Sequence, residues 1–427
     1  MSKLEELIAR LCPDGVEYKK LCDCVKPVSN INWNKTKDLY QYIDLSSVDR
    51  DNHCILETQV INADNAPSRA KQIILKDDVL VGTTRPLLKR YCMIQDDYDN
   101  NICSTGFCVL RAEQSIVLPR WIYHNVSSND FFAHVELFQK GASYPAISDK
   151  ELKEYKLPVP PLEVQREIVH ILDSFTLLTA ELTAELAARQ KQYEFYRDML
   201  LTFDDVRAGG TTSRSLKQAL FENSRNIVEY KATKDLTVDS FWLMPSTPKF
   251  LESGIKYITS KNIKNGKIEY DTAKFISEDD YNKISSNRAI QRNDLLITMI
   301  GTIGEAAFVD TDEPFYGQNL YLLRLNPQII NRKYYFYFIT QSKIKNSLVS
   351  KKNASSQGYI KAGSIENLVV PVPPLSEQQR IVDILDRFDA LCNDITSGLP
   401  AEIEARRKQY EYYRDKLLTF KELKKEA

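Results

Sequence analysis

The sequence PVPPLEVQREIVHILDSF at residues 158–175 returns almost unchanged as PVPPLSEQQRIVDILDRF at residues 371–388. Twelve of the eighteen aligned residues are identical, at an offset of 213 positions. Further on, RQKQYEFYRDMLLTF at 189–203 matches RRKQYEYYRDKLLTF at 406–420 in twelve of fifteen positions, at an offset of 217. A repeat with a period of half the chain indicates two whole domains with connecting elements, because solenoid repeats are only roughly 20–50 residues long.

The repeated segments have the apolar spacing of helices. Ile168, Ile171, Leu172 and Phe175 fall at i, i+3, i+4 and i+7, and the second copy repeats this pattern. The prolines before each pattern cannot continue a helix backwards. We therefore expect each helix to begin directly after its prolines.

The second copy carries start and stop signals that the first copy lacks. The four extra residues that change the offset fall around Gly398 and Pro400. Glycine is typical of the end of a helix, and proline is typical of the first turn of the next one. Ser376, followed three residues later by Gln379, predicts a capping box. We expect a long helix of about 24 residues, or roughly 36 Å, starting near Thr179 in the first copy and at the proline in the second.

Within these long helices, apolar residues also recur at intervals of seven, which is typical of helices that pack against other helices. A lone pattern of this kind is more often a helix in an ordinary domain core. Two nearly identical copies favour pairing of the two helices around a pseudo-twofold axis. The residues predicted to pair the helices or to dock a subunit are Leu186, Tyr193, Tyr196, Leu200, Ile403, Tyr410, Tyr413 and Leu417.

The segments between the repeated helices differ from each other and contain short β-like runs separated by polar loops. The clearest runs lie at residues 71–75, 107–110, 294–298 and 320–324. We therefore predict an α+β fold, in which two similar globular domains are separated by two long conserved helical regions. The predicted segments are 1–157 (first globular domain), 158–209 (central helical region), 210–370 (second globular domain) and 371–427 (C-terminal helical region).

The composition is that of an ordinary globular protein, with 43% apolar and 27% charged residues in a chain of 427. No apolar run approaches the roughly 20 residues of a membrane helix, and the charged N-terminus is unlike a signal peptide, so we expect a cytoplasmic protein. Eight cysteines fit a reducing compartment better than a disulfide scaffold. Because the net charge is −1, a polyanion such as DNA must be bound by local basic clusters.

The PVPPL helices and the KQYE(F/Y)YRD helices, each present twice, resemble those of the specificity (S) subunits of Type I restriction–modification enzymes. The resemblance covers the whole chain. It implies that the two globular domains are target-recognition domains, each reading one half of a bipartite asymmetric sequence in double-stranded DNA. It also implies that the long helices form an antiparallel coiled coil that sets the spacer between the half-sites.

The resemblance further implies that this chain is not itself an enzyme and binds no cofactor. Modification (methyltransferase) subunits would dock on the helical regions and supply S-adenosylmethionine. A restriction (motor-nuclease) subunit would join them for cleavage, with ATP and Mg²⁺. The sequence agrees, because it contains no glycine-rich nucleotide cradle, and Asn326-Pro327 is its nearest approach to an Asn-Pro-Pro-aromatic methyltransferase loop.

Basic and polar clusters in both domains are the candidate DNA contacts, because Arg and Lys bind phosphates or guanine, and Asn and Gln bind adenine. Such clusters also suit solvated surface loops. The candidates in the first domain are Arg69, Lys71, Thr83, Thr84, Arg85, Lys89 and Arg90. Those in the second domain are Lys261, Asn262, Lys264, Asn265, Lys351, Lys352 and Gln357.

The residues alone leave two other classes of function open. Asp14, Glu17 and Lys19 resemble the signature of Mg²⁺-dependent nucleases, which would make the chain a stand-alone nuclease, although their close spacing argues against a shared metal ion. The other class is a coiled-coil scaffold that reads no DNA. Cys22 and Cys24 lack the spacing of a zinc site, so no metal site is predicted.

Overall fold

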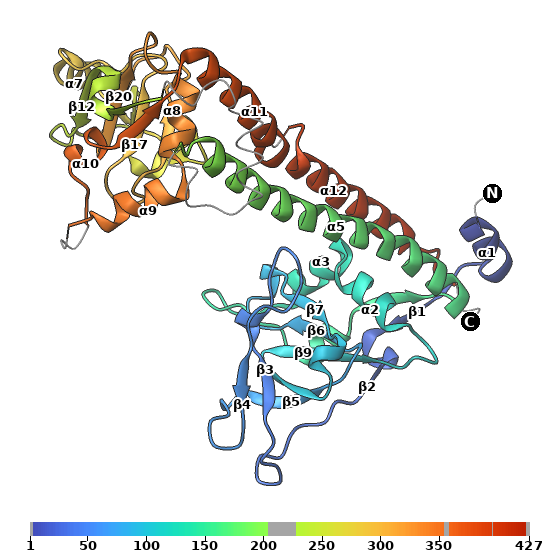
Figure 1. Cartoon of the computed structure of the whole chain (residues 1–427). Helices are drawn as coiled ribbons and strands as arrows, with labels where there is room; N and C mark the ends of the chain where they lie inside the picture. The colour runs from blue at the N-terminus through green and yellow to red at the C-terminus, as the bar shows by residue number, and fades with distance from the viewer. Residues whose placement is uncertain (1–2, 204–227, 354–357, 395, 424–427) are drawn as a thin grey trace. The chain divides into compact units, whose positions relative to one another are not determined.

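The structure, a computed structural model, describes residues 3–203, 228–353, 358–394 and 396–423. The chain divides into two compact units, the first of residues 1–184 and 401–427 and the second of residues 185–400. Helix α5 (Leu162–Leu200) crosses the boundary, so its first half belongs to one unit and its second half to the other (Figure 1). Each unit therefore takes helices from both copies of the repeat.

The first unit contains a globular domain, residues 17–159, named the first domain below. Its two ends pair as a short antiparallel ladder, β1 (Glu17–Lys20) with β10 (Lys156–Val159). One four-stranded sheet has the order β2 (Val25–Lys26), β9 (Phe107–Ala112), β6 (Val79–Gly82), β7 (Tyr91–Met93). The other has the order β4 (Gln59–Ile61), β3 (Tyr40–Ile43), β8 (Asn101–Ser104), β5 (Ala70–Ile74), with β3 and β8 parallel.

The second unit contains the second domain, residues 229–372, built in the same way. Its ends pair as β11 (Glu229–Ala232) with β21 (Val369–Val372). The main sheet has the order β12 (Thr237–Leu243), β20 (Leu320–Leu325), β17 (Leu295–Thr298), β18 (Ala306–Phe308). A three-stranded sheet has the order β16 (Lys274–Ile276), β13 (Ile255–Ile258), β19 (Phe315–Gly317), with β13 and β19 parallel, and a hairpin pairs β14 (Ile263–Lys264) with β15 (Lys267–Ile268).

The predicted α+β fold with an internal repeat is confirmed. The four β-like runs are strands β5, β9, β17 and β20, with ends within two residues of those predicted. Strands β6 and β17 are buried along their whole length, which explains their continuous apolar sequence.

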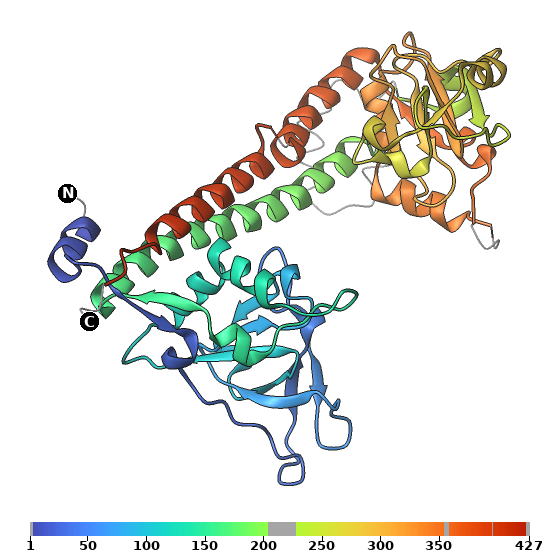
Figure 2. The same cartoon turned by 180° about the vertical axis from the view of Figure 1, so that it is seen from behind.

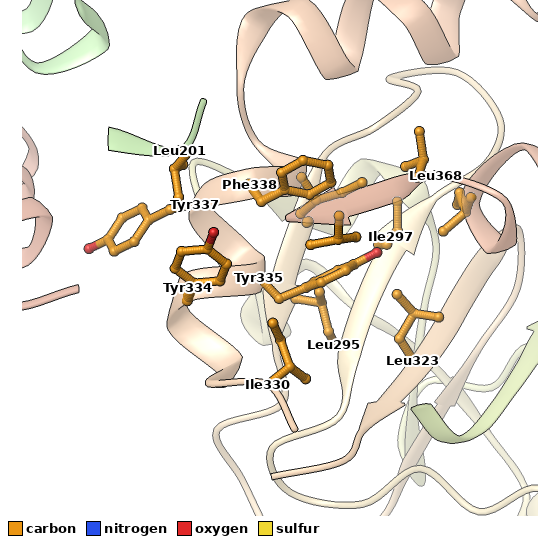
Figure 3. Packing of buried hydrophobic residues seen from close by; sticks show 14 of the residues in the cluster. Leu201, Leu295, Ile297, Leu323, Ile330, Tyr334, Tyr335, Tyr337, Phe338 and Leu368 are labelled. Atoms are coloured by element: carbon orange, nitrogen blue, oxygen red, sulfur yellow. The ribbon is translucent and has the colours of Figure 1, made fainter. Parts of the chain in front are cut away.

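In each domain a helix packs on the main sheet, and a second helix follows it. These pairs are α2 (Pro119–Val126) with α3 (Asn129–Phe138), and α8 (Arg332–Ile339) with α9 (Ser342–Ser350). Further helices are α1 (Lys3–Leu11), α4 (Asp149–Lys153), α7 (Glu278–Ser285) and α10 (Ala362–Glu366). Figure 3 shows the packing in the second domain, where the ring of Tyr335 from α8 lies against Leu295 and Leu323 of the sheet.

The helical regions differ between the two copies. The first copy forms one helix of 39 residues, α5. The second copy forms two helices of 19 residues, α11 (Leu375–Asn393) and α12 (Leu399–Leu417). The break between them contains Gly398, where a Cβ atom would lie 2.5 Å from a backbone oxygen, and Pro400 lies in the first turn of α12 as predicted. Residues 176–186 contain neither glycine nor proline, so α5 continues through the equivalent place.

Two expectations about these helices are wrong. The long helix of the first copy begins at Leu162, directly after its prolines, and not near Thr179. Ser376 is not a helix cap, because α11 begins one residue earlier and has Pro374 as its N-cap without a side-chain hydrogen bond. The amide of Gln379 accepts a hydrogen bond from Asn331 of the second domain instead, at 2.8 Å.

Helices from the two copies lie side by side within each unit. In the first unit α12 runs antiparallel to the first half of α5, and Phe175 stacks on Tyr413 with ring centres 5.5 Å apart (Figures 1 and 2). In the second unit the second half of α5 lies against α11, and Tyr196 stacks on Phe388 at 5.4 Å. The C-terminal segment returns to the start of the first domain, where Val16 donates a backbone hydrogen bond to residue 421.

One hydrogen-bonded joint between domain and helix occurs in both units. The side chain of Gln165 on α5 donates to the carbonyls of Ile116 and Pro160 and accepts from the N–H of Leu118. Gln378 on α11 makes the same three bonds to residues 213 positions further along. Both glutamines are fully buried. The joint therefore fixes each helix to its domain in the same way.

A buried ion pair is also duplicated. Arg111 on β9 donates two hydrogen bonds to Asp78, at 2.9 and 2.7 Å, and Arg324 on β20 donates two to Asp294, at 2.9 and 2.8 Å. Each aspartate directly precedes a central strand, is at most 2% exposed and also accepts a backbone N–H. Bidentate pairs of this kind fix geometry, so the turns into β6 and β17 are held alike.

Within the part of the chain that the structure describes, no helix is both long enough and apolar enough to cross a lipid bilayer.

Candidate nucleic-acid interface

The loop between β6 and β7 contains five of the first domain's candidate DNA contacts. Its base is closed by a hydrogen bond from the N–H of Gly82 to the carbonyl of Arg90, at 2.7 Å. Thr83 is buried and donates its hydroxyl to Gly106, so its side chain is not available to a ligand. Thr84 is half-buried, whereas Arg85 and Lys89 are exposed on either side of a short 3₁₀ turn.

A second loop, residues 140–146, supports this one. Lys140 and Ala146 exchange two backbone hydrogen bonds of 2.8 Å, and Pro145 accepts a 2.7 Å bond from the N–H of Arg85. The guanidinium of Arg85 lies over the ring of Tyr144, 4.3 Å from its centre. Tyr144 is 70% exposed, so the stacked pair is open to solvent.

The cations of the β6–β7 loop have no acidic partner within the described part of the chain. Among the described residues, Arg85, Lys89 and Arg90 form no ion pair. Other surface cations of the same domain do, for example Lys76 with Asp96 at 2.7 Å. Unpaired positive charge on exposed side chains can bind a phosphate backbone or a guanine edge.

The remaining candidates of the first domain lie beside the other sheet. Arg69 is exposed directly before β5, and its carbonyl accepts from the N–H of Thr105 at 2.9 Å. Lys71 is exposed on β5. Neither forms an ion pair with another described residue, so both side chains are available to an anion.

The second domain has the equivalent loop between β17 and β18, residues 298–305, but with different chemistry. The closing bond is retained, from the N–H of Thr298 to the carbonyl of Glu305 at 2.8 Å. Gly301 and Gly304 have positive φ angles of 78° and 81°. Glu305, the last residue of the loop, forms an ion pair with Lys345 at 2.8 Å. This loop therefore has the same frame but presents no free cation.

Basic residues of the second domain gather elsewhere. Lys261 is exposed beside the β14–β15 hairpin, and Asn265 forms its turn with φ 50°. Lys264 is exposed but paired with Glu269 at 2.8 Å. Asn262 is buried and makes four side-chain hydrogen bonds within the domain, so it is a structural residue and not a free reader of bases.

Two further candidates follow α9. Lys351 and Lys352 are exposed there, and neither is ion-paired with a described residue. Gln357 lies outside the described residues. The second domain therefore offers its cations on two segments, at the hairpin and after α9.

Seven of the eight predicted helix-pairing residues are buried or half-buried, and Tyr413 is exposed. Tyr193 and Leu200 are buried in the core of the second unit, and Tyr410 and Leu417 pack against the core of the first. Leu186 and Tyr196 pack against the core of the second unit, and Ile403 is buried in the first. Tyr413 is 36% exposed, with its ring stacked on Phe175. Burial is the first cause that raises the pKa of the Tyr193 phenol above its ordinary value.

One hydrogen-bonded network joins helices α2, α5 and α12 of the first unit. His124 of α2 lies 2.8 Å from Asp173 of α5 and 2.9 Å from the phenol of Tyr410 of α12. Burial lowers the pKa of His124 below its ordinary value, although Asp173 opposes this. Burial alone would raise the pKa of Asp173, but the bond from His124 and the charge of Arg120 leave it below the ordinary value. The second unit has Tyr337 in place of the histidine, bonded to Asp386 at 2.6 Å.

Two exposed aromatic residues were missed in the sequence. Phe195 is 57% exposed and Tyr412 is 62% exposed, and the two occupy the same position of the KQYE(F/Y)YRD repeat. The signal was present, because three aromatic residues within four positions cannot all face one side of a helix. The middle aromatic residue had to point away from the helix pair.

The nuclease signature is not assembled as a metal site. Glu17 and Lys19 form an ion pair of 3.4 Å on β1, and Asp14 lies in the turn before it. In residues 3–203, 228–353, 358–394 and 396–423, no three acidic, histidine or cysteine side chains lie close enough to hold a metal ion. Cys24 is buried, and burial raises the pKa of its thiol to about 12.

Comparison with known proteins identifies the family. The model of the Type I restriction modification DNA specificity domain matches residues 13–189 and again residues 249–405. The EcoR124I/EcoR124II specificity subunit of Escherichia coli is 34% identical over 290 residues, which is 64% of this chain and 65% of that protein. A putative type I specificity subunit of Haemophilus influenzae, S.HindORF215P, is 30% identical over 321 residues, covering 70% of this chain and 72% of that one.

Two solved structures have a similar fold. One comes from work on complex assembly and conformational transition of the type I R-M system, with a TM-score of 0.64, 22% identity, and 95% and 98% of the two chains covered. The other is the S subunit of a Type I system from M. genitalium, with a TM-score of 0.51, 14% identity, and 95% and 96% covered. With the family model matching both copies of the repeat, the chain belongs to the Type I restriction–modification DNA specificity family.

Proposed function

We propose that this chain is the DNA sequence-recognition subunit of a Type I restriction–modification complex. Each domain reads one half of a bipartite asymmetric target in double-stranded DNA. The observation that carries this proposal is the contrast within the repeat: the buried joint at Gln165 recurs at Gln378, whereas the charged loop around Arg85 is replaced by glycines. Two similar frames with unequal loops suit two unequal half-sites, because sequence is read by side chains that reach base edges.

The helical regions would dock the modification subunits. Phe195 and Tyr412 supply an exposed aromatic side chain at the same repeat position in each unit, and such residues are enriched at protein interfaces. The repetition fits two copies of one partner. Methyl transfer with S-adenosylmethionine would then belong to those subunits, and cleavage with ATP and Mg²⁺ to a restriction subunit. The assembly would act in the cytoplasm, where its DNA target lies.

Docking is tested by exchanging both exposed aromatics for serine. We expect Phe195→Ser with Tyr412→Ser to fold normally but to bind the modification subunits at least tenfold more weakly, because aromatic anchors dominate interface energies. Leu137→Ser is the matched control, since Leu137 is 75% exposed on α3, away from the repeat. Equal affinity of the double variant and the control would refute the docking surface.

DNA recognition is tested on the assembled methyltransferase by sequencing methylated sites. We expect one bipartite motif with two unlike halves. Cleavage of plasmid by the purified chain with Mg²⁺ alone would support the nuclease alternative. An assembled complex that selects no motif from random duplexes would support a scaffold without DNA reading.

A further inference from the structure

The β6–β7 loop holds two cationic residues in a backbone conformation that their residue type disfavours. Arg85 has φ 48° and ψ 56°, and Lys89 has φ 53° and ψ 41°. Residues other than glycine rarely adopt this left-handed region. Arg85 also precedes Pro86, and a residue before proline is restricted further toward extended conformations. Both positions are therefore strained.

The second domain shows that the same loop can be built without strain. Its equivalent loop has Gly301 and Gly304 at positive φ, and glycine adopts this conformation freely. The surrounding backbone bonds correspond: Ile147 donates to Thr83 at 3.0 Å, and Ile360 donates to Met299 at 3.1 Å. The first domain thus retains strained cationic residues where glycine would serve the fold. Strain that the fold does not need points to a function of the side chains.

The side chain of Arg85 is arranged to read a base. Its guanidinium carbon lies over the ring of Tyr144, 4.3 Å from the ring centre, and both residues are exposed. A guanidinium over an aromatic face is attracted to the ring while its N–H groups can still bind a ligand. It makes no ion pair with any carboxylate in the described part of the chain. A planar guanidinium with free edges is complementary to the O6 and N7 acceptors of guanine in the major groove.

Its neighbours suit the DNA backbone instead. The ammonium of Lys89 lies 5.0 Å from the centre of the Phe132 ring, and no described carboxylate pairs with it. A lysine offers a point charge without the planar fork, which is the chemistry of a phosphate contact. The loop therefore combines one residue with base-reading geometry and another with phosphate-binding geometry.

From these contacts we infer that Arg85, held on the ring of Tyr144, reads a guanine in the half-site of the first domain. The inference rests on the proposed function and deepens it by naming the residue and the base. The second domain has glycine in the equivalent loop, so it reads its half-site with other segments.

The test uses the assembled methyltransferase and a panel of duplexes in which each base pair of the methylated target is replaced in turn. Arg85→Gly should reduce discrimination at one G·C pair of one half-site by roughly 10- to 100-fold and leave the other half-site unchanged. Because glycine relieves the strained backbone, the melting temperature should not fall. Arg85→Lys should lose the same discrimination while keeping the salt dependence of binding, because the charge remains.

A matched control is Lys76→Ala, which removes an exposed cation of the same domain that is already paired with Asp96. It should change neither discrimination nor the salt dependence. Tyr144→Leu should weaken discrimination at the same base pair as Arg85→Gly, because it removes the stack but keeps the arginine.

Three results would overturn the inference. Weaker binding of Arg85→Gly to all duplexes alike, with a smaller salt dependence, would make Arg85 a phosphate contact. Unchanged discrimination would remove it from the interface. A lower melting temperature of Arg85→Gly would make its role structural. Failure of the proposed function looks different, because the wild-type complex itself would then discriminate at no position of one half-site.

Discussion

The two units of the chain share a buried hydrogen-bonded joint and a buried ion pair, but they differ in the loop that follows the central strand. Gln165 and Gln378 make the same three hydrogen bonds, and Asp78 and Asp294 the same bidentate pair. The loop that follows the central strand keeps its closing backbone bond in both domains, yet it is cationic in one and glycine-rich in the other. The comparison teaches that the two copies keep the same buried contacts around the central strand while the side chains of the loop that follows it have diverged.

The largest expected loss of stability comes from placing a charged side chain among the packed helices. Tyr193→Asp with Tyr410→Asp replaces the buried ring of Tyr193 and the half-buried ring of Tyr410 by carboxylates. The change should destabilise the second unit by about 4 kcal/mol and the first by about 3 kcal/mol. Urea unfolding measures this. The control is Phe195→Asp with Tyr412→Asp, the same change on exposed aromatics, which should lose docking but not stability. Equal unfolding midpoints for both double variants would show that these two tyrosines do not hold the units together.

Removing the aspartate of the duplicated ion pair should cause a smaller loss of stability. Asp78→Ala leaves Arg111 half-buried without its carboxylate partner and should lower stability by about 3 kcal/mol. Asp294→Ala leaves Arg324 only its longer contact with Asp239, at 3.5 Å, and should lower stability by about 2–3 kcal/mol. Lys76→Ala, which breaks an exposed pair, should lower it by less than about 1 kcal/mol. Denaturant titration compares the three. A loss at Asp78 with none at Asp294 would show that the frame is not equivalent in the two units.

Much of the frame could be predicted from the sequence, because its signals are local. Apolar spacing located the helices, the prolines marked their starts, and Gly398 with Pro400 marked the break before α12. The joint at Gln165 was not predictable, since its partners lie 47 and 49 residues away and glutamine has no periodicity to reveal it. The false capping box at Ser376 shows the limit of a local motif, because the proline before the helix had already set its start.

The candidate interface was predicted only as a set of basic loops. The sequence pointed to Arg85, Thr83 and Asn262 alike as possible DNA contacts. It could not show that the side chains of Thr83 and Asn262 form hydrogen bonds inside their domains and are not available to DNA. Side-chain satisfaction depends on contacts across sheets, which a single sequence does not contain. The stack on Tyr144 joins two loops more than 50 residues apart, so it also required the structure.

Lowering the pH should destabilise the first unit slightly more than the second. All four histidines lie in the first unit, and residues 185–400 contain none. Burial lowers the pKa of His53 to about 4 and that of His124 below its ordinary value. The unfolded chain therefore takes up protons below about pH 6.5 that the folded unit excludes, so the first unit loses stability as the pH falls from 6.5 toward 5.

Calorimetry at pH 7.5 and 5.5 measures this difference. The transition of the first unit should shift down by on the order of a few degrees more than that of the second. His124→Tyr, which copies Tyr337 of the second unit, should reduce the shift. A larger acid shift in the histidine-free unit would contradict the assignment.

The smallest expected effect on stability belongs to the spacer. Four residues inserted between Leu178 and Leu186 extend a helix by about 6 Å, slightly more than one turn, and a coiled coil absorbs such a step as a stutter. At roughly 3.4 Å per base pair this is nearly two base pairs. We expect methylated-site sequencing to show a longer spacer with both half-sites unchanged. An active variant with the original spacer would show that α5 does not set the distance.

The central claim is that each domain reads its half-site independently on an equivalent frame. The ladders β1–β10 and β11–β21 have the same register, so residues 21–155 can be replaced by residues 233–368 of the same chain. Sequencing of the sites methylated by a complex with this duplicated domain is the most direct test. We predict that the half-site of the second domain appears on both sides of an unchanged spacer. Retention of the original half-site of the first domain, or loss of both original half-sites in an active complex, would contradict the claim.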